Sequence, residues 1–182
     1  MSQTWFTSDL HLGHANIIKY CNRPFANVQE MDEALIENWN ARIKPADLVY
    51  VLGDFALVPP QEVAPRYVSR LHGTKQLIYG NHDRFLKDKR REFGFAWVGP
   101  YKEIKVSNQL IVMCHYPFMT WRSSHRGSWS LHGHSHGSLA RDMTCRRLDV
   151  GVDPNGYKPL SYEEVAQEMA KVVFKPVDHH DL

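Results

Sequence analysis

Short apolar runs alternate with longer amphipathic stretches in the first half of the chain. The runs at residues 4–8, 47–52 and 75–79 predict three β-strands, and the second is apolar enough to be buried on both faces. Between the first two strands, apolar side chains recur at helical spacing: Val28, Met31, Leu35, Trp39 and Ile43. Asn27 followed by Glu30 is typical of a helix N-terminus. The pattern therefore predicts β-α-β alternation.

Two further helices are expected before residue 95. Residues 60–71 predict a weaker helix, because Pro65 lies inside it, and residues 84–93 predict a short charged helix.

The pattern changes in the second half of the chain. Ile104 and Val106 alternate with polar residues, and an apolar run at 110–114 follows a polar turn, which predicts an antiparallel hairpin. Two more strands are expected at 129–131 and 147–152. A last helix should begin near Ser161, with Glu164 three residues later.

Length and composition narrow the classes of protein. The chain has 182 residues, 43% of them hydrophobic, which suits one α/β domain over residues 1–182, with residues 175–182 expected to be a frayed tail. Lys and Arg number 22 against 20 Asp and Glu, so a sequence-independent grip on nucleic acid is not favoured. The apolar runs are much shorter than the roughly 20 residues that cross a bilayer.

Neither the N-terminus nor the cysteines point to secretion. The first residues show no basic region followed by an apolar stretch, so a cytoplasmic location is the default. Three widely spaced cysteines, outside any C-x-x-C pair, suit reduced thiols: Cys21, Cys114 and Cys145. Oligomeric state is left open, because no heptad pattern is legible.

Candidate chemistry gathers where the expected strands end. The first strand ends in Asp9-Leu10-His11, whose first and third side chains share one side of an extended backbone. The later ends carry Asp54 after Gly53, the run Gly80-Asn81-His82-Asp83, His115, and the pair His134 and His136. Any one of these is also typical of a turn or a hydrogen-bonded surface histidine. Five successive ends with oxygen and imidazole ligands indicate a metal centre.

As an ordered set, D-x-H, G-D, G-N-H-D, H and G-H-x-H resembles the calcineurin-like metallophosphoesterase superfamily over residues 9–136. The stretches 8–14, 125–129 and 150–153 also resemble a compact bacterial and phage branch of predicted phosphoesterases. The resemblance implies a four-layer α/β/β/α sandwich, in which two mixed sheets are flanked by helices and carry a two-metal centre.

The resemblance also implies a role for each motif. Asp9, His11 and His136 would hold one divalent ion, Asn81, His115 and His134 would hold the other, and Asp54 would bridge the two. A hydroxide between the ions would attack the phosphorus of a phosphodiester or phosphomonoester, a nucleotide among them. His82 would stabilise the transition state or protonate the leaving oxygen, and Asp83 would orient it. Mn²⁺ is expected first, with Fe, Zn²⁺, Co²⁺ or Ni²⁺ as alternatives, because the ligands are too rich in nitrogen for Mg²⁺ or Ca²⁺ alone.

Substrate contacts are expected from His14, Arg23, Arg122 and Arg126. His14 would face the substrate, or else be an ordinary helix-start residue. Arg122 and Arg126 lie in the loop before the G-H-x-H motif and could grip phosphate oxygens or serve only for solubility. Arg23 lies in a similar polar loop near the first motif and could supply a second cationic contact. Tyr116 and Trp121 could stack a base or be rim aromatics. Two other functions stay open: a nuclease of the same superfamily, and a catalytically silent metal-binding scaffold for partner proteins.

Overall fold

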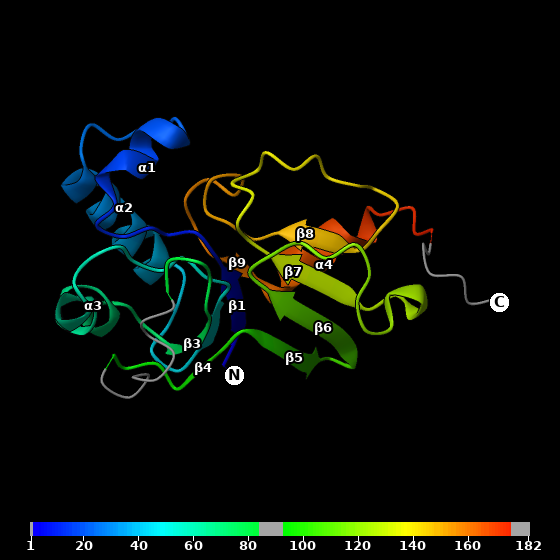
Figure 1. Cartoon of the computed structure of the whole chain (residues 1–182). Coiled ribbons are helices and arrows are strands. Elements are labelled where there is room, and N and C mark those ends of the chain that lie inside the picture. The colour runs from blue at the N-terminus through cyan, green and yellow to red at the C-terminus, as the bar shows by residue number, and fades with distance from the viewer. Residues whose placement is uncertain (1, 84–92, 176–182) are drawn as a thin grey trace.

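Two β-sheets face each other in the computed structural model, which describes residues 2–83 and 93–175 (Figure 1). The five-stranded sheet has the order β4-β3-β2-β1-β9, and the four-stranded sheet has the order β5-β6-β7-β8. The strands of the five-stranded sheet are β1 (Thr4–Thr7), β2 (Leu48–Val51), β3 (Thr74–Ile78), β4 (Trp97–Gly99) and β9 (Leu160–Ser161). The second sheet comprises β5 (Tyr101–Val106), β6 (Gln109–Cys114), β7 (Trp129–His132) and β8 (Arg147–Asp149).

Both sheets are mixed, as the resemblance implied. Strands β1 to β4 run parallel and β9 runs antiparallel to β1. In the second sheet, β5 and β6 form the expected hairpin, but β6, β7 and β8 pair in parallel. The long connections before β7 and β8 allow these crossovers, so the antiparallel character expected of the second half holds only for the hairpin.

The helices are α1 (Ala15–Tyr20), α2 (Val28–Asn40), α3 (Pro60–Arg66) and α4 (Tyr162–Ala170), with single 3₁₀ turns η1 (Val68–Arg70) and η3 (Ser124–Arg126). Helices α1, α2 and α3 cover the outer face of the five-stranded sheet (Figure 1). The expected helix at 60–71 is broken after Arg66, and the one at 84–93 lies almost wholly outside the described residues. Within the described residues, no helix has the length and apolarity to cross a bilayer.

Helix ends follow the sequence signals. The Asn27 side chain accepts a hydrogen bond from the Glu30 N–H at 2.9 Å and caps α2. At α4, Ser161 Oγ accepts from the Glu164 N–H at 3.1 Å while the Glu164 carboxylate accepts from the Ser161 N–H at 2.8 Å. This reciprocal pair is a capping box.

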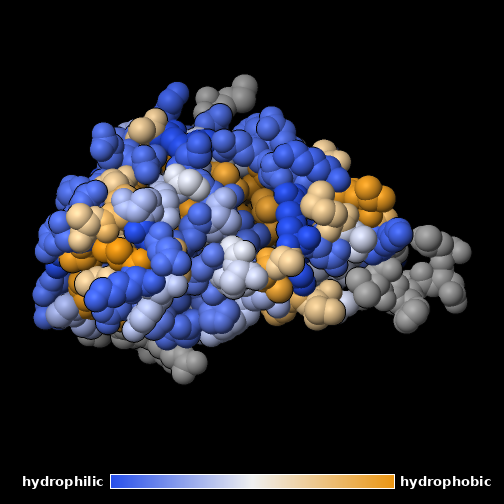
Figure 2. Space-filling view, turned by 90° about the horizontal axis from the view of Figure 1, so that it is seen from above, coloured by the Kyte–Doolittle hydropathy of each residue, from blue (hydrophilic) through white to orange (hydrophobic). Residues whose placement is uncertain are grey.

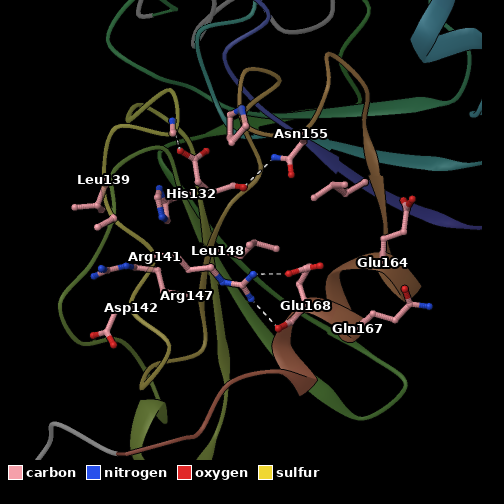
Figure 3. Close-up of a pocket in the computed structure, with 15 residues that line it drawn as sticks. His132, Leu139, Arg141, Asp142, Arg147, Leu148, Asn155, Glu164, Gln167 and Glu168 are labelled. Carbon is pink, nitrogen blue, oxygen red and sulfur yellow. Dashed lines mark hydrogen bonds and ion pairs between the residues drawn. The ribbon is translucent and has the colours of Figure 1, made fainter.

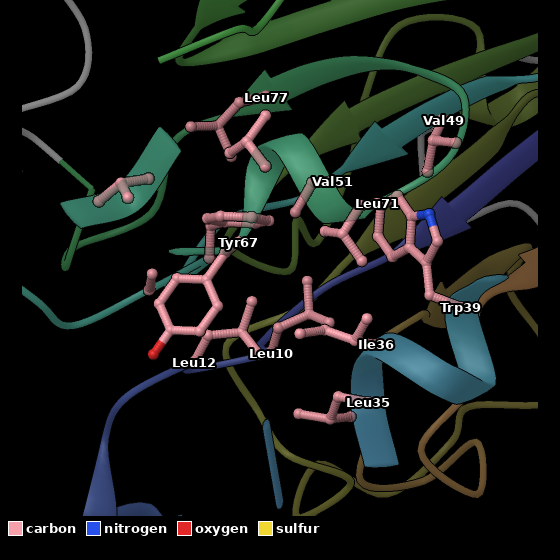
Figure 4. Packing of buried hydrophobic residues seen from close by; sticks show 14 of the residues in the cluster. Leu10, Leu12, Leu35, Ile36, Trp39, Val49, Val51, Tyr67, Leu71 and Leu77 are labelled. Atoms are coloured by element: carbon pink, nitrogen blue, oxygen red, sulfur yellow. The ribbon is translucent and has the colours of Figure 1, made fainter. Parts of the chain in front are cut away.

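Alternation along the strands divides the apolar side chains between two cores. Trp5 and Val49 point toward the helices, where Trp39 and Leu35 of α2 meet them in the cluster of Figure 4. Phe6 and its neighbours point the other way and pack between the sheets. Because each sheet is anchored on a buried face, the loops that leave the strand ends start from fixed positions.

A candidate metal centre

Seven polar side chains from both sheets meet at the strand ends. Asp9 and His11 follow β1, Asp54 follows β2 and Asn81 follows β3. From the second sheet, His115 follows β6, and His134 and His136 follow β7. All seven were expected as ligands from the sequence. The structure brings them together at one edge of the two sheets.

The donor atoms form overlapping groups. Those of Asp9, His11 and His136 lie within 4.8 Å of one another, as do those of Asp9, Asp54 and His115. Asn81 joins the second group, because its Oδ1 is 3.1 Å from His115 Nε2. The His134 ring centre lies 5.0 Å from that of His115.

Asp54, a member of the second group, also lies close to the first. Its Oδ2 is 3.5 Å from His11 Nε2 on one side and 3.5 Å from His115 Nε2 on the other. One carboxylate therefore faces imidazoles from both sheets, which is the arrangement that a bridging ligand requires.

Backbone geometry turns these side chains inward. Asp9, His11, Asp54, His134 and His136 all have φ between 47° and 68°, in the left-handed region that non-glycine residues rarely adopt. Backbone hydrogen bonds hold two of these positions: the Asp9 N–H donates to Gly53 O at 3.0 Å, and the His11 N–H donates to Asp54 O at 2.9 Å.

Close packing at Gly133 brings the second sheet against the first. A Cβ atom added there would lie 1.9 Å from Ser8 Oγ and 2.4 Å from Asp9 Oδ2. The next residue, His134, donates its N–H to both oxygens of Asp9, at 3.1 and 2.9 Å. Only glycine at 133 permits this approach.

The electrostatics of the buried residues fit a cation. Burial raises the pKa of Asp9 to about 8, although His136 opposes the shift. Burial, then the neighbouring His136, lowers the pKa of His11 to about 2, so its ring is neutral. His11 Nε2 is buried, and among the described residues it has no hydrogen-bond partner. A divalent cation would satisfy this nitrogen and favour the ionised form of Asp9.

His82 and His14 lie at the open side of the group. The His82 side chain is 38% exposed, and its Nε2 is 4.0 Å from Asp54 Oδ2. Its backbone N–H donates to Asp54 Oδ1 at 3.0 Å, which places the ring next to the proposed bridging ligand. The His14 ring centre is 6.1 Å from that of His82, and His14 Nδ1 is 3.3 Å from His11 Nδ1.

Asp83 does not orient His82, contrary to the role that the resemblance implied. It is fully buried, and its carboxylate accepts backbone N–H groups from Asp54 at 2.5 Å, Phe55 at 3.0 Å and Gly80 at 3.0 Å. These bonds tie the loop after β2 to the loop after β3. Asp83 therefore positions Asp54 rather than His82.

Arg23 was expected to contact substrate, but its side chain is 0% exposed. The guanidinium instead donates to the backbone oxygens of Asp9 and Leu10 and to both carboxylate oxygens of Asp153. Asp153 lies in the stretch 150–153, whose resemblance to the bacterial and phage branch implies no particular role for it. A guanidinium enclosed in this way cannot reach a substrate.

The other two arginines lie on the surface. Arg122 is 67% exposed and pairs with Glu103 of β5. Arg126 is exposed at the end of η3. Neither position excludes a substrate contact, and their role stays a prediction.

The face of the molecule seen in Figure 2 is mainly hydrophilic, with hydrophobic residues in separate groups. A cavity of about 550 Å³ lies next to β8 and α4, with His132, Arg147 and Glu168 among its lining residues (Figure 3). None of the seven grouped side chains lines it. The grouped side chains therefore lie outside this cavity, although Gly137, the residue after His136, lines it.

Comparisons with known proteins identify one matching family and several similar chains. Residues 2–151 match the family described as calcineurin-like phosphoesterase. An uncharacterized protein of Methanocaldococcus jannaschii is 33% identical over 181 residues, which cover 95% of this chain and 96% of that one. The gene 66 protein of Mycobacterium phage L5 is 28% identical over 195 residues, covering 91% and 93%. The crystal structure of a protein of unknown function from Aquifex aeolicus superposes with a TM-score of 0.73 at 25% identity, covering 92% of this chain and 100% of that one.

Proposed function

The chain belongs to the calcineurin-like phosphoesterase family, and from that premise we propose that it hydrolyses a phosphate ester with two divalent metal ions. The observation that carries the proposal is Asp54 Oδ2, which lies 3.5 Å from imidazole nitrogens of both donor groups. Asp9, His11 and His136 would hold one ion, Asn81, His115 and His134 the other, and Asp54 both.

The mixed nitrogen and oxygen ligation disfavours Mg²⁺ or Ca²⁺ alone, and we propose Mn²⁺ first, with Fe, Zn²⁺, Co²⁺ or Ni²⁺ as alternatives. When bound, two such ions would polarise the phosphoryl oxygens and lower the pKa of a water molecule. The three cysteines are free thiols, which supports a reducing compartment such as the cytoplasm.

His82 would hold the proton that the leaving oxygen needs. Its ring is next to Asp54 and 38% exposed, so it can face a substrate on the open side of the centre. General acid catalysis of this kind contributes about 10²- to 10⁴-fold to the rate. His14, whose ring is near that of His82, would contact the substrate on the same side.

A nucleotide is the substrate class that we favour. Tyr116 is 41% exposed, and its ring centre lies 4.7 Å from that of His134 and 5.0 Å from that of His115. An exposed phenol packed on two proposed ligands could stack a base while the phosphate lies at the centre.

The first test uses metal-stripped protein with and without Mn²⁺, assayed on bis-p-nitrophenyl phosphate and p-nitrophenyl phosphate. We expect turnover that requires metal and is lost in Asp54→Ala. Asp47→Asn is the matched control, because it alters a buried carboxylate at the opposite end of β2. Metal-independent turnover, or none with any of the five metals despite bound metal, would contradict the proposal and favour a scaffold.

Tyr116→Ala tests the substrate class. Loss of base stacking should raise KM for a cyclic nucleotide about 5- to 100-fold and leave a glycerophosphodiester, which has no ring, nearly unchanged. Tyr101→Ala, which removes a phenol 38% exposed on β5, should change neither KM. Equal effects of Tyr116→Ala on both substrates would argue against a nucleotide.

A further inference from the structure

The guanidinium of Arg23 is fully buried next to the proposed centre. Its Nη2 donates to Asp9 O at 2.7 Å and its Nη1 to Leu10 O at 2.9 Å. Nε and Nη2 donate to the two oxygens of Asp153, at 2.8 and 2.9 Å. Burying a charge costs free energy unless its hydrogen-bond donors are satisfied. The four hydrogen bonds to oxygen atoms therefore hold the Arg23 guanidinium in one position.

Asp153, which Arg23 holds, in turn contacts His136. Its Oδ2 is 2.7 Å from His136 Nδ1, and the far nitrogen of the same ring, Nε2, is 3.9 Å from Asp9 Oδ1. When His136 Nδ1 carries the proton and donates it in a hydrogen bond to Asp153 Oδ2, Nε2 carries the lone pair, on the side of the ring that faces Asp9. The ring is then in the form that a metal ligand needs.

We propose that Arg23 and Asp153 form a positioning pair that sets the tautomer of His136 and the place of Asp9, and so determines the affinity of one of the two ions. The inference rests on the proposed function and deepens it. Neither residue touches the substrate. Arg23 holds the backbone that carries Asp9, and Asp153 holds the ring that completes the same ligand group.

The effect should fall mainly on one ion, because Arg23 and Asp153 contact Asp9 and His136 directly and reach the other ligand group only through Asp9. In the other ligand group, His115 directs its Nδ1 to a neutral acceptor, Leu52 O, at 2.8 Å. No contact links Arg23 or Asp153 to Asn81, His115 or His134 among the described residues. A merely structural ion pair would predict a general loss of stability instead.

An alternative is that Asp153 is itself a metal ligand, because the Cys21 thiol lies near His136 and Asp153 in another group of potential ligands. Burial raises the pKa of Cys21 to about 11, so it stays protonated at neutral pH. Both oxygens of Asp153 are also engaged by Arg23. The geometry therefore assigns Asp153 to holding His136 rather than to a metal of its own.

Two measurements test the pair in the full chain, and neither needs substrate. The affinity of each Mn²⁺ ion is measured by competition with a chelator. The ring nitrogens of His136 are observed by NMR in the metal-free protein at alkaline pH, because, against the effect of burial, the neighbouring Asp153 and Asp9 raise the pKa of this ring and only the neutral ring has tautomers. In Asp153→Asn and Arg23→Lys, we expect one ion to bind about 10- to 100-fold more weakly and the other to be weakened much less. The His136 signals should shift from the single Nδ1–H form toward a mixture of tautomers.

Asp47→Asn is again the control: it should lower thermal stability and change neither ion nor tautomer. The pair is refuted if both variants keep a pure Nδ1–H ring and bind both ions as tightly as the wild type, or if both ions weaken equally. If one variant fails to fold, the other decides. A wild-type protein that binds two ions and hydrolyses no ester would overturn the proposed function and leave this inference standing.

Discussion

Among single residues, His82 differs from the proposed ligands because its ring is partly open to solvent. We expect His82→Gln to lower kcat about 10²- to 10⁴-fold, since the proton for the leaving oxygen is lost. Bound metal should stay at the wild-type level, because the ring is not needed to hold it. Metal analysis beside the steady-state assay checks both. A parallel loss of metal would make His82 a ligand instead.

Asp47 gives a residue-scale prediction about pH. Burial disfavours its charge, but hydrogen bonds from Gln3, Lys44 and Trp5 outweigh this and lower the pKa of Asp47. A lowered folded pKa means that stabilisation is present above the unfolded value, near 4, and is lost as pH falls through the folded value. Asp47→Asn should therefore cost about 1–3 kcal/mol at pH 7.

The difference between wild type and Asp47→Asn should shrink as the solution is acidified below pH 4. Urea unfolding at pH 7 and at successively lower pH measures it. A difference that stays constant, or widens in acid, would contradict the depressed pKa.

Residue types at strand ends were enough to identify the seven grouped side chains, but not the residues behind them. The sequence around Arg23, a polar loop, fits a side chain that points outward to a phosphate as well as one that points inward to Asp153. Asp83 next to His82 suggests a contact with His82, whereas its carboxylate binds three backbone N–H groups. Side-chain direction within a loop is decided by tertiary packing, which a single sequence does not display.

At the scale of elements, the sequence predicted long, periodic segments well. The helix α2 with its Asn27 cap, the capping box of α4, and the hairpin of β5 and β6 all lie where expected. The elements that were missed are short: α1 has six residues, β4 three and β9 two. Segments of this length carry too few positions for periodicity to show.

Gly133 gives the prediction at this scale, because two elements from different sheets touch there. In Gly133→Ala the new Cβ would clash with Ser8 Oγ and Asp9 Oδ2, so the loop after β7 must move away from β1. We expect loss of at least one bound ion and a lower Tm. Thermal unfolding and metal analysis are the measurements.

The control is Gly94→Ala, where φ is +75° and the nearest side-chain atom to a new Cβ is 3.2 Å away. That change should cost about 1 kcal/mol through backbone strain and leave metal content intact. Wild-type metal content in Gly133→Ala would show that the close approach is not required.

At the scale of the whole molecule, the proposed ions join the two sheets. Four ligands come from the first sheet and three from the second, and Asp54 contacts both groups. The sandwich of two sheets followed from the resemblance rather than from periodicity. The parallel crossovers to β7 and β8 were missed, because a single sequence gives strand positions but not strand pairing.

Metal binding should therefore stabilise the whole fold. With free Mn²⁺ at 100 times its Kd, stability should rise by about 2.7 kcal/mol per ion, or several degrees in Tm. Differential scanning calorimetry with Mn²⁺ and with a chelator measures the shift. Asp54→Ala should abolish most of it. An unchanged Tm in the wild type would mean that the centre binds no metal, or binds it equally in the unfolded chain.

Five of the seven proposed ligands lie at positive φ, where an L-residue costs about 1–2 kcal/mol. Glycine would relieve that cost and abolish the ligand. Selection of random variants for heat resistance alone, without metal, should therefore enrich glycine at positions such as 134 and 136. Thermal stability and the proposed metal centre therefore make opposite demands on the same residues of this chain, so a more heat-stable variant that keeps the centre would have to gain its stability from substitutions elsewhere.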